Sequence, residues 1–195
     1  MGLNLELNLI KLIQSVFFTE NYNIIDMTAK FISSRKYKIY FITIYFIFLV
    51  LTRKTINEYI VIPKLYIFGY LSRILNIQIK LLFKRKRPYV VDNNVLVLEK
   101  SREKKKDTFS LPSNSIQTSL IFYGFLLRQL NLNRYLSSLI LGVIVFITSF
   151  AKINRGMHYP TDIILSILIY HVTIIIYSKL LTVVVDYYGI DNIYK

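Results

Sequence analysis

Cysteine is absent from the 195 residues of this sequence. A disulfide framework and zinc bound by thiolates are therefore excluded, and the redox compartment is left undetermined. Histidine is scarce, so imidazole chemistry depends on His158 or His171. Acidic residues are also few, because 11 Asp and Glu stand against 25 Lys and Arg, which gives a formal net charge of +14.

Polar residues are few overall, since 54% of the chain is hydrophobic and the mean hydropathy is +0.44. A bilayer core about 30 Å thick requires roughly 20 helical residues. Five apolar runs approach or exceed this length, and short basic or polar loops separate them: 37–51, 59–83, 116–130, 135–150 and 163–185. We predict an all-α, polytopic transmembrane bundle with five to six membrane helices. The alternative is a soluble helical protein with unusually apolar helices.

The length predicts a single domain over residues 1–195. Within it we distinguish a weaker N-terminal helical segment, 1–36, a motif-bearing core, 60–185, and a polar loop, 91–110. The apolar stretch from Leu9 to Phe18 is short, carries Lys11 and lacks a small-residue cleavage site. It predicts an interfacial or partly inserted helix and not a removed signal peptide.

The basic residues are concentrated in one part of the chain. Ten of them lie between Lys80 and Lys106, together with three acidic residues. In a soluble chain such a charge would suggest nucleic acid, but beside membrane helices it predicts lipid headgroups, a phosphorylated substrate, or both. We interpret the lysines of 91–110 as a solvated membrane-surface face. Lys84, Arg85 and Lys86 are interpreted as positive flanking of a membrane helix.

The segment RGMHYPTD, residues 155–162, places His158 and Asp162 four residues apart at the start of an apolar run. Near one helical turn, both side chains can lie on the same face. The carboxylate can then fix the tautomer of the ring and leave the other nitrogen as a nucleophile. Pro160 suits the first turn of a helix, whose positive end would point at an anion. Taken alone, such a pair is more often a structural hydrogen bond.

Two further groups suit an anion. Lys80 and Arg87 are seven residues apart, close to two helical turns, and can share a face before the chain leaves the helix at Pro88. A guanidinium fork and a lysine charge suit a phosphate dianion. Ser113 and Asn114 precede the third run, where a hydroxyl and helix-start N–H groups could form an oxyanion cradle. The simpler interpretation of these two residues is a helix N-cap.

Each membrane crossing reverses the chain. The end of the second run, the Pro112-Ser113 turn and the 152–162 loop are therefore predicted to lie on the same side of the membrane, where the three motifs can meet in one pocket.

This ordered set resembles the type 2 phosphatidic acid phosphatase superfamily, over about residues 60–185. Its first motif, Lys, six residues, Arg-Pro, is intact at Lys80 and Arg87-Pro88. Its second motif, Pro-Ser-Gly-His, appears as Pro-Ser-Asn-Ser at 112–115. Its third motif, Ser-Arg, five residues, His, three residues, Asp, begins as Ala-Lys at 151–152 and continues with His158 and Asp162. Vanadium haloperoxidases share this pattern but are soluble.

The resemblance implies an integral-membrane lipid phosphatase that needs no metal and no cofactor. His158 would attack phosphorus and Asp162 would orient it. The substrate-binding residues would be Lys80, Arg87, Ser113, Asn114 and Lys152. The substrate would be phosphatidate, a sphingoid phosphate or a prenyl diphosphate, and no nucleic acid would be bound. The positive-inside rule places the site in the cytosol, but the resemblance favours the lumen of the endoplasmic reticulum or another endomembrane, and we adopt the latter.

Two departures from the motifs predict a slowed enzyme. The second-motif histidine, which protonates the leaving group, is Ser115, and the third-motif arginine is Lys152. His171 lies thirteen residues beyond His158, roughly 20 Å along a helix, so it cannot replace the lost acid and is expected to be structural. The alternative is a catalytically inactive relative that binds a phosphorylated lipid or a protein partner. A channel or transporter bundle gives no reason for the ordered motifs.

Overall fold

The computed structural model describes residues 2–19, 23–52, 59, 61–97, 109–130 and 132–188, and side chains except those of 61 and 181–188. Over these residues the protein is helical and contains no strand, which confirms the predicted all-α class. The helices are α1 (Gly2–Phe17), α2 (Ile24–Ser33), α3 (Arg35–Leu51), α5 (Val61–Phe83), α6 (Pro88–Val91), α8 (Asn114–Gln129), α9 (Arg134–Asn154) and α10 (Pro160–Tyr188). Most of the predicted polar loop 91–110 lies outside the described residues.

Local sequence explains several helix ends. Asn23 and Asp26 form a reciprocal capping box at the start of α2. Asn133 accepts a hydrogen bond from the Tyr135 N–H at the start of α9. Arg87 has an extended backbone, as expected before proline, and Pro88 opens α6.

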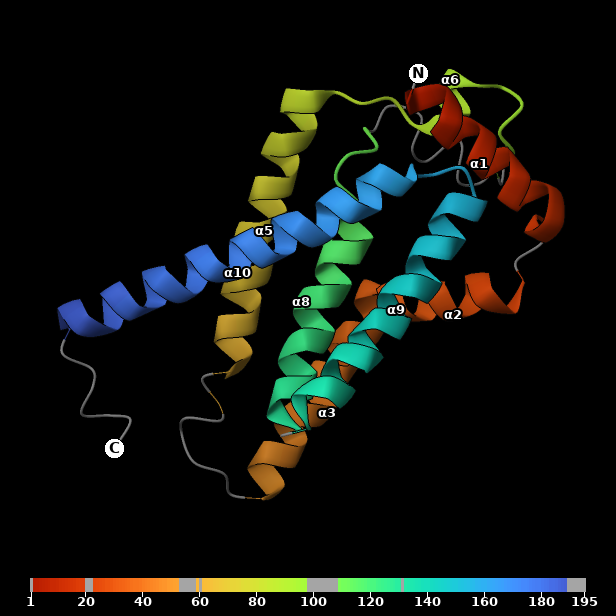
Figure 1. Cartoon of the computed structure of the whole chain (residues 1–195). Helices are drawn as coiled ribbons and strands as arrows, with labels where there is room; N and C mark the ends of the chain where they lie inside the picture. The colour runs from red at the N-terminus through yellow and green to blue at the C-terminus, as the bar shows by residue number, and fades with distance from the viewer. Residues whose placement is uncertain are drawn as a thin grey trace.

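The long helices alternate in direction (Figure 1). α5 and α9 end where α8 and α10 begin, and α1 lies across this end of the bundle. We call it the loop end. It carries residues 84–97, 109–113 and 155–159. The end of α5, the turn before α8 and the α9–α10 loop therefore meet at one end of the bundle, as expected if each apolar run reverses the direction of the chain.

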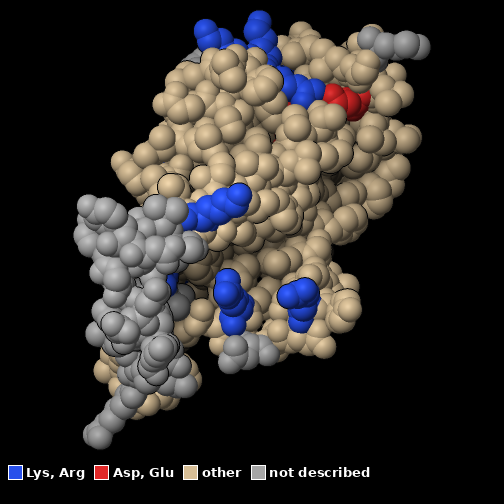
Figure 2. Space-filling view, turned by 60° about the vertical axis from the view of Figure 1, so that its left-hand side comes forward, with Lys and Arg blue, Asp and Glu red and all other residues tan. Residues whose placement is uncertain are grey.

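Among the described residues, two helices are long and apolar enough to cross a membrane: α9, and α10 from Pro160 to Leu180. The face drawn in Figure 2 carries Lys and Arg near its upper and lower ends, and one further basic side chain lies on the otherwise uncharged surface between them. Many large apolar side chains of α3, α9 and α10 are exposed, among them Phe46, Leu139, Phe146, Leu168 and Ile175. This distribution suits helices that contact lipid.

Two apolar clusters hold the bundle together. At the loop end, Leu7 and Ile10 of α1 pack with Tyr89, Val95, Met157 and Tyr159. In the interior, Phe68 of α5 packs with Ile116, Leu120 and Ile121 of α8 and with Ile163 and Tyr170 of α10. The first cluster attaches α1 to the loop that carries His158.

Gly156 gives a test of this packing. Its φ is +59°, and a Cβ there would lie 2.6 Å from Val95 Cγ1 and 2.8 Å from the Leu96 carbonyl oxygen. We expect Gly156→Ala to destabilise the protein by about 1–2 kcal/mol from its backbone conformation alone, and by more if the neighbours cannot move. Thermal unfolding in detergent measures this. Gly142→Ala is the control, because a Cβ at Gly142 meets nothing within 4 Å. Equal losses in both variants would contradict the prediction.

Candidate functional site

His158 and Asp162 lie side by side at the loop end, and both are buried, with exposed fractions of 3% and 0%. His158 Nδ1 is 3.6 Å from Asp162 Oδ2, slightly beyond hydrogen-bond length. The same oxygen accepts a hydrogen bond of 2.9 Å from the Tyr159 N–H. Among the described residues, His158 Nδ1 has no hydrogen-bond partner. The carboxylate therefore faces one ring nitrogen, as the four-residue spacing predicted.

The environment of His158 keeps its ring neutral. Burial lowers the pKa of His158 to about 3, the charges of Arg87 and Lys152 act in the same direction, and Asp162 opposes them. At neutral pH the imidazole therefore has a free lone pair, which a nucleophile requires.

Lys80 and Arg87 meet at one carbonyl group. Lys80 Nζ donates to the Phe109 carbonyl oxygen at 2.8 Å, and Arg87 Nη2 donates to the same atom at 3.2 Å. Arg87 Nη1 donates to the Met157 carbonyl oxygen at 2.7 Å, directly before His158. The first-motif cations thus lie beside the histidine loop, although 71 positions of sequence separate Arg87 from His158.

Ser113 stands at the N-cap position of α8, as the simpler interpretation expected. Its side chain does not cap α8, and its hydroxyl is buried with no hydrogen-bond partner among the described residues. Its backbone N–H donates to Ser166 Oγ at 2.7 Å, so this N–H is not free for an oxyanion. The hydroxyl remains the group of Ser113 that can bind a ligand.

Asn114 and Lys152 have different surroundings. Asn114 is exposed, and its amide oxygen accepts a hydrogen bond of 3.2 Å from Asn76 of α5. Lys152 lies half-buried in the last turn of α9, close enough to His158 for its charge to act on the ring. The Asn114 amide, by contrast, is already engaged with α5.

The structure also describes Ser115, which stands at the position of the lost acid, and His171, the second histidine of the chain. Ser115, the second residue of α8, is half-buried and offers only a hydroxyl at the position of the lost acid. His171 is exposed on α10, and its Nδ1 lies 2.8 Å from the Ile167 carbonyl oxygen of the preceding turn. This bond agrees with the structural role expected for His171.

Arg85 was interpreted as a flanking charge like Lys84 and Lys86, and that interpretation is wrong. Arg85 Nη1 donates to Asp162 Oδ1 at 2.8 Å, and Nη2 donates to Glu6 Oε2 at 2.6 Å. Its guanidinium also lies 3.9 Å from the centroid of the Tyr159 ring. No local pattern distinguishes Arg85 within KRKR, because its partners come from α1 and α10.

Ser166 is a second residue that the sequence analysis missed. Its hydroxyl donates to the Asp162 carbonyl oxygen and accepts from the Ser113 N–H. Ser166 therefore ties the turn before α8 to α10. The spacing of four from Asp162, which puts both on one helix face, was a usable signal.

The α1 helix is fastened to this site by hydrogen bonds as well as by packing. The Gln14 side chain donates to the carbonyl oxygens of Leu96 and Asn154, at 2.7 and 2.9 Å, and accepts from the Leu96 N–H at 2.9 Å. Arg155 forms a buried ion pair with Asp26 of α2. The N-terminal helices therefore hold the α9–α10 loop from outside the motif-bearing core.

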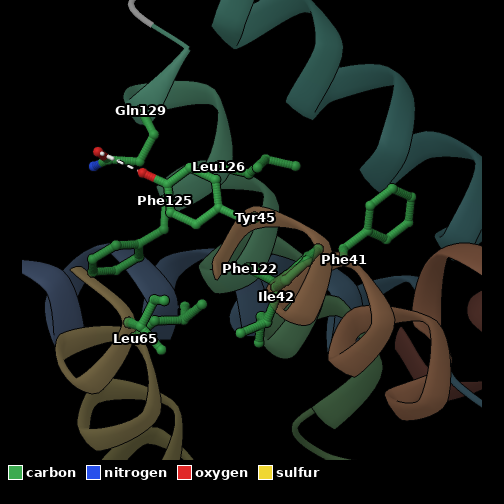
Figure 3. A pocket seen from close by; sticks show the side chains of 9 residues that line it. Phe41, Ile42, Tyr45, Leu65, Phe122, Phe125, Leu126 and Gln129 are labelled. Carbon is green, nitrogen blue, oxygen red and sulfur yellow. Dashed lines mark hydrogen bonds between the residues drawn. The ribbon is translucent and has the colours of Figure 1, made fainter. Parts of the chain in front are cut away.

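An apolar hollow between α3, α5 and α8 is separate from these residues (Figure 3). Phe41, Ile42, Tyr45, Leu65, Phe122, Phe125, Leu126 and Gln129 line it together with Ile62. At its edge the Tyr45 hydroxyl donates to Gln129 Oε1 at 3.4 Å. Phe122 lies eight residues beyond Asn114, or about 12 Å along α8. Within the described residues, no cluster of His, Cys, Asp or Glu could hold a metal ion.

Comparison with known proteins gives one match. A family model described as the PAP2 superfamily matches residues 63–184. The matched range contains Lys80, Arg87, Ser113, His158 and Asp162, and it leaves out α1, α2 and α3. No curated protein and no solved structure matches the chain significantly.

Proposed function

Since the chain belongs to the PAP2 superfamily, we propose that it is an integral-membrane phosphatase that acts, without a metal, on a lipid phosphate or a polyprenyl diphosphate. The observation that carries this proposal is the buried, neutral His158, which faces Asp162 and lies beside Arg87 and Lys152. Neutral imidazole is the form that attacks phosphorus, and cations nearby suit a phosphate dianion.

In the proposed reaction, the Nε2 lone pair of His158 attacks phosphorus and the bond from phosphorus to the leaving oxygen breaks. A phosphohistidine forms, and Asp162 stabilises the positive ring through Nδ1–H. Lys80, Arg87, Lys152 and the Ser113 hydroxyl are the proposed partners of the phosphoryl oxygens. Water then breaks the nitrogen–phosphorus bond, which releases phosphate and returns the ring to its neutral form.

We further propose that α3, α5 and α8 cross the membrane with α9 and α10, and that the loop end faces the lumen of the endoplasmic reticulum or another endomembrane. Among these, α5 has 23 residues, whereas α3 and α8 have 17 and 16. Flanking residues would complete the shorter spans. Labelling of a cysteine introduced at Lys86 by a membrane-impermeant reagent would test the side, because the natural chain has no cysteine.

The second candidate is an inactive relative that binds a phosphorylated lipid or a protein partner. Ser115 favours it, because a serine hydroxyl cannot act as an acid near neutral pH. General acid catalysis is typically worth about 10²–10⁴ in rate. The cationic pocket can still bind an anion without this group.

The leaving group predicts substrate preference. An alcohol leaves as an alkoxide, whose conjugate acid has a pKa near the value of about 15.7 for water. A phosphate leaving group has a second pKa of about 6 and needs a proton far less. We therefore expect prenyl diphosphates to be hydrolysed about 10²-fold or more faster than phosphatidate. Phosphate release by the purified protein on both substrates tests this, and equal rates or a monophosphate preference would contradict it.

A further inference from the structure

The two carboxylate oxygens of Asp162 have different partners. Oδ1 accepts the hydrogen bond from Arg85 Nη1, at 2.8 Å. Oδ2 accepts from the Tyr159 N–H and faces His158 Nδ1 at 3.6 Å. Arg85 therefore holds the oxygen that points away from the histidine and leaves the other oxygen directed at the ring.

Arg85 is itself fixed from several sides. Nη1 also donates to the Thr161 hydroxyl at 2.6 Å, and Nη2 donates to Glu6 Oε2 at 2.6 Å. The guanidinium lies over the Tyr159 ring. Both terminal nitrogens thus donate to carboxylates, Nη1 to Asp162 and Nη2 to Glu6, which places Arg85 to hold Asp162.

Glu6 connects this contact to α1. Its Oε1 accepts from the Thr161 N–H at 3.1 Å and from the Thr161 hydroxyl at 2.6 Å. Thr161 is the second residue of α10, where a carboxylate also interacts favourably with the helix dipole. One carboxylate therefore fixes both Arg85 and the first turn of the helix that carries Asp162.

We propose that Glu6 and Arg85 form a positioning pair, which holds Asp162 so that its Oδ2 orients His158. This inference rests on the proposed function for its kinetic consequence. Through Glu6, α1 would then help to position Asp162, although α1 lies outside the matched range 63–184. A residue that orients a reacting group through a hydrogen bond, without touching the substrate, typically contributes about 10–100-fold in activity.

The charged and titratable groups around the pair come from every element packed on it. They are Glu6 of α1, Lys80 of α5, Arg85 and Arg87 of the α5–α6 connection, Asp92 directly after α6, Lys152 of α9, and Tyr159, His158 and Asp162 of the α9–α10 segment.

Titration of His158 tests the pair without any enzyme assay. The full chain labelled at histidine has only two histidine signals, and His171→Gln assigns them. In the wild type, burial lowers the pKa of His158 to about 3. In Arg85→Gln the charge of Asp162 is no longer neutralised by the guanidinium. We expect the pKa of His158 to rise by about 1–3 units. Lys86→Gln, which removes an exposed cation one residue away, is the control and should leave it unchanged.

Glu6→Gln is the second variant, for the case in which Arg85→Gln does not fold. It keeps one acceptor oxygen for Thr161 and removes the charge that fixes Arg85. Loss of a negative charge by itself can only lower a histidine pKa, so a rise in the pKa of His158, smaller than in Arg85→Gln, is the expected sign that Arg85 no longer neutralises Asp162. Circular dichroism and thermal unfolding establish that each variant is folded before its titration is interpreted.

Steady-state kinetics provides the second measurement. Arg85→Gln should lower kcat about 10–100-fold while KM stays within about twofold, since Arg85 orients Asp162 and does not touch the phosphate. If wild type and His158→Ala release phosphate at the same rate, the proposed function is contradicted. The titration of His158 would still show whether Glu6 and Arg85 position Asp162. The proposal of a positioning pair is overturned if the pKa of His158 in folded Arg85→Gln and in folded Glu6→Gln equals its pKa in Lys86→Gln.

Discussion

Replacing His158 by alanine is expected to lower the rate of phosphate release by about 10⁴-fold or more, because the variant loses the atom that would form the bond to phosphorus. His158 is buried beside Asp162, and burial keeps its ring neutral at the pH of the assay. Initial rates of phosphate release from a prenyl diphosphate, measured on the purified protein in detergent, give the comparison.

His171→Ala is the matched control. It removes the other histidine, which is exposed on α10 and bonded to its own helix. We expect its rate to stay within about twofold of wild type, since surface substitutions usually change stability by no more than about 0.5 kcal/mol. If both alanine variants release phosphate as fast as wild type, the phosphohistidine mechanism is wrong.

Ser115→His is expected to have the second largest effect, in the opposite direction. A histidine there would restore a proton donor at the leaving group, and general acid catalysis is typically worth about 10²–10⁴ in rate. Ser115 is half-buried in the first turn of α8, two residues after the Ser113 hydroxyl. We expect the gain on phosphatidate, whose alkoxide needs the proton, and little gain on a prenyl diphosphate. Rates on both substrates measure it.

Ser115→Asn is the control for side-chain size, because asparagine cannot donate a proton as an acid. Activity that appears only in Ser115→His, with none in wild type, would favour the inactive relative and show that the rest of the pocket is still competent. No gain on either substrate would contradict the assignment of Ser115 to the acid position.

Local spacing predicted the contacts that are made within one turn or one helix end. His158 and Asp162 are four residues apart, and the structure places Nδ1 and Oδ2 3.6 Å from each other. Arg87 precedes a proline and has the extended backbone that proline imposes. The alternating direction of the apolar runs predicted that the end of one run would lie near the start of the next. That prediction did not depend on which side chains are in contact.

By itself, then, the sequence determined the all-α class and the family, and it placed Asp162 within reach of His158, because four residues around one helix start cannot carry the two side chains far apart. Only the tertiary structure decided that Arg85 holds Asp162, that Glu6 holds Arg85 and that Ser166 occupies the Ser113 N–H. These partners are 77, 79 and 53 positions apart. Contacts at such separations depend on how α1 and α10 pack at the loop end, and no spacing along the chain encodes that packing.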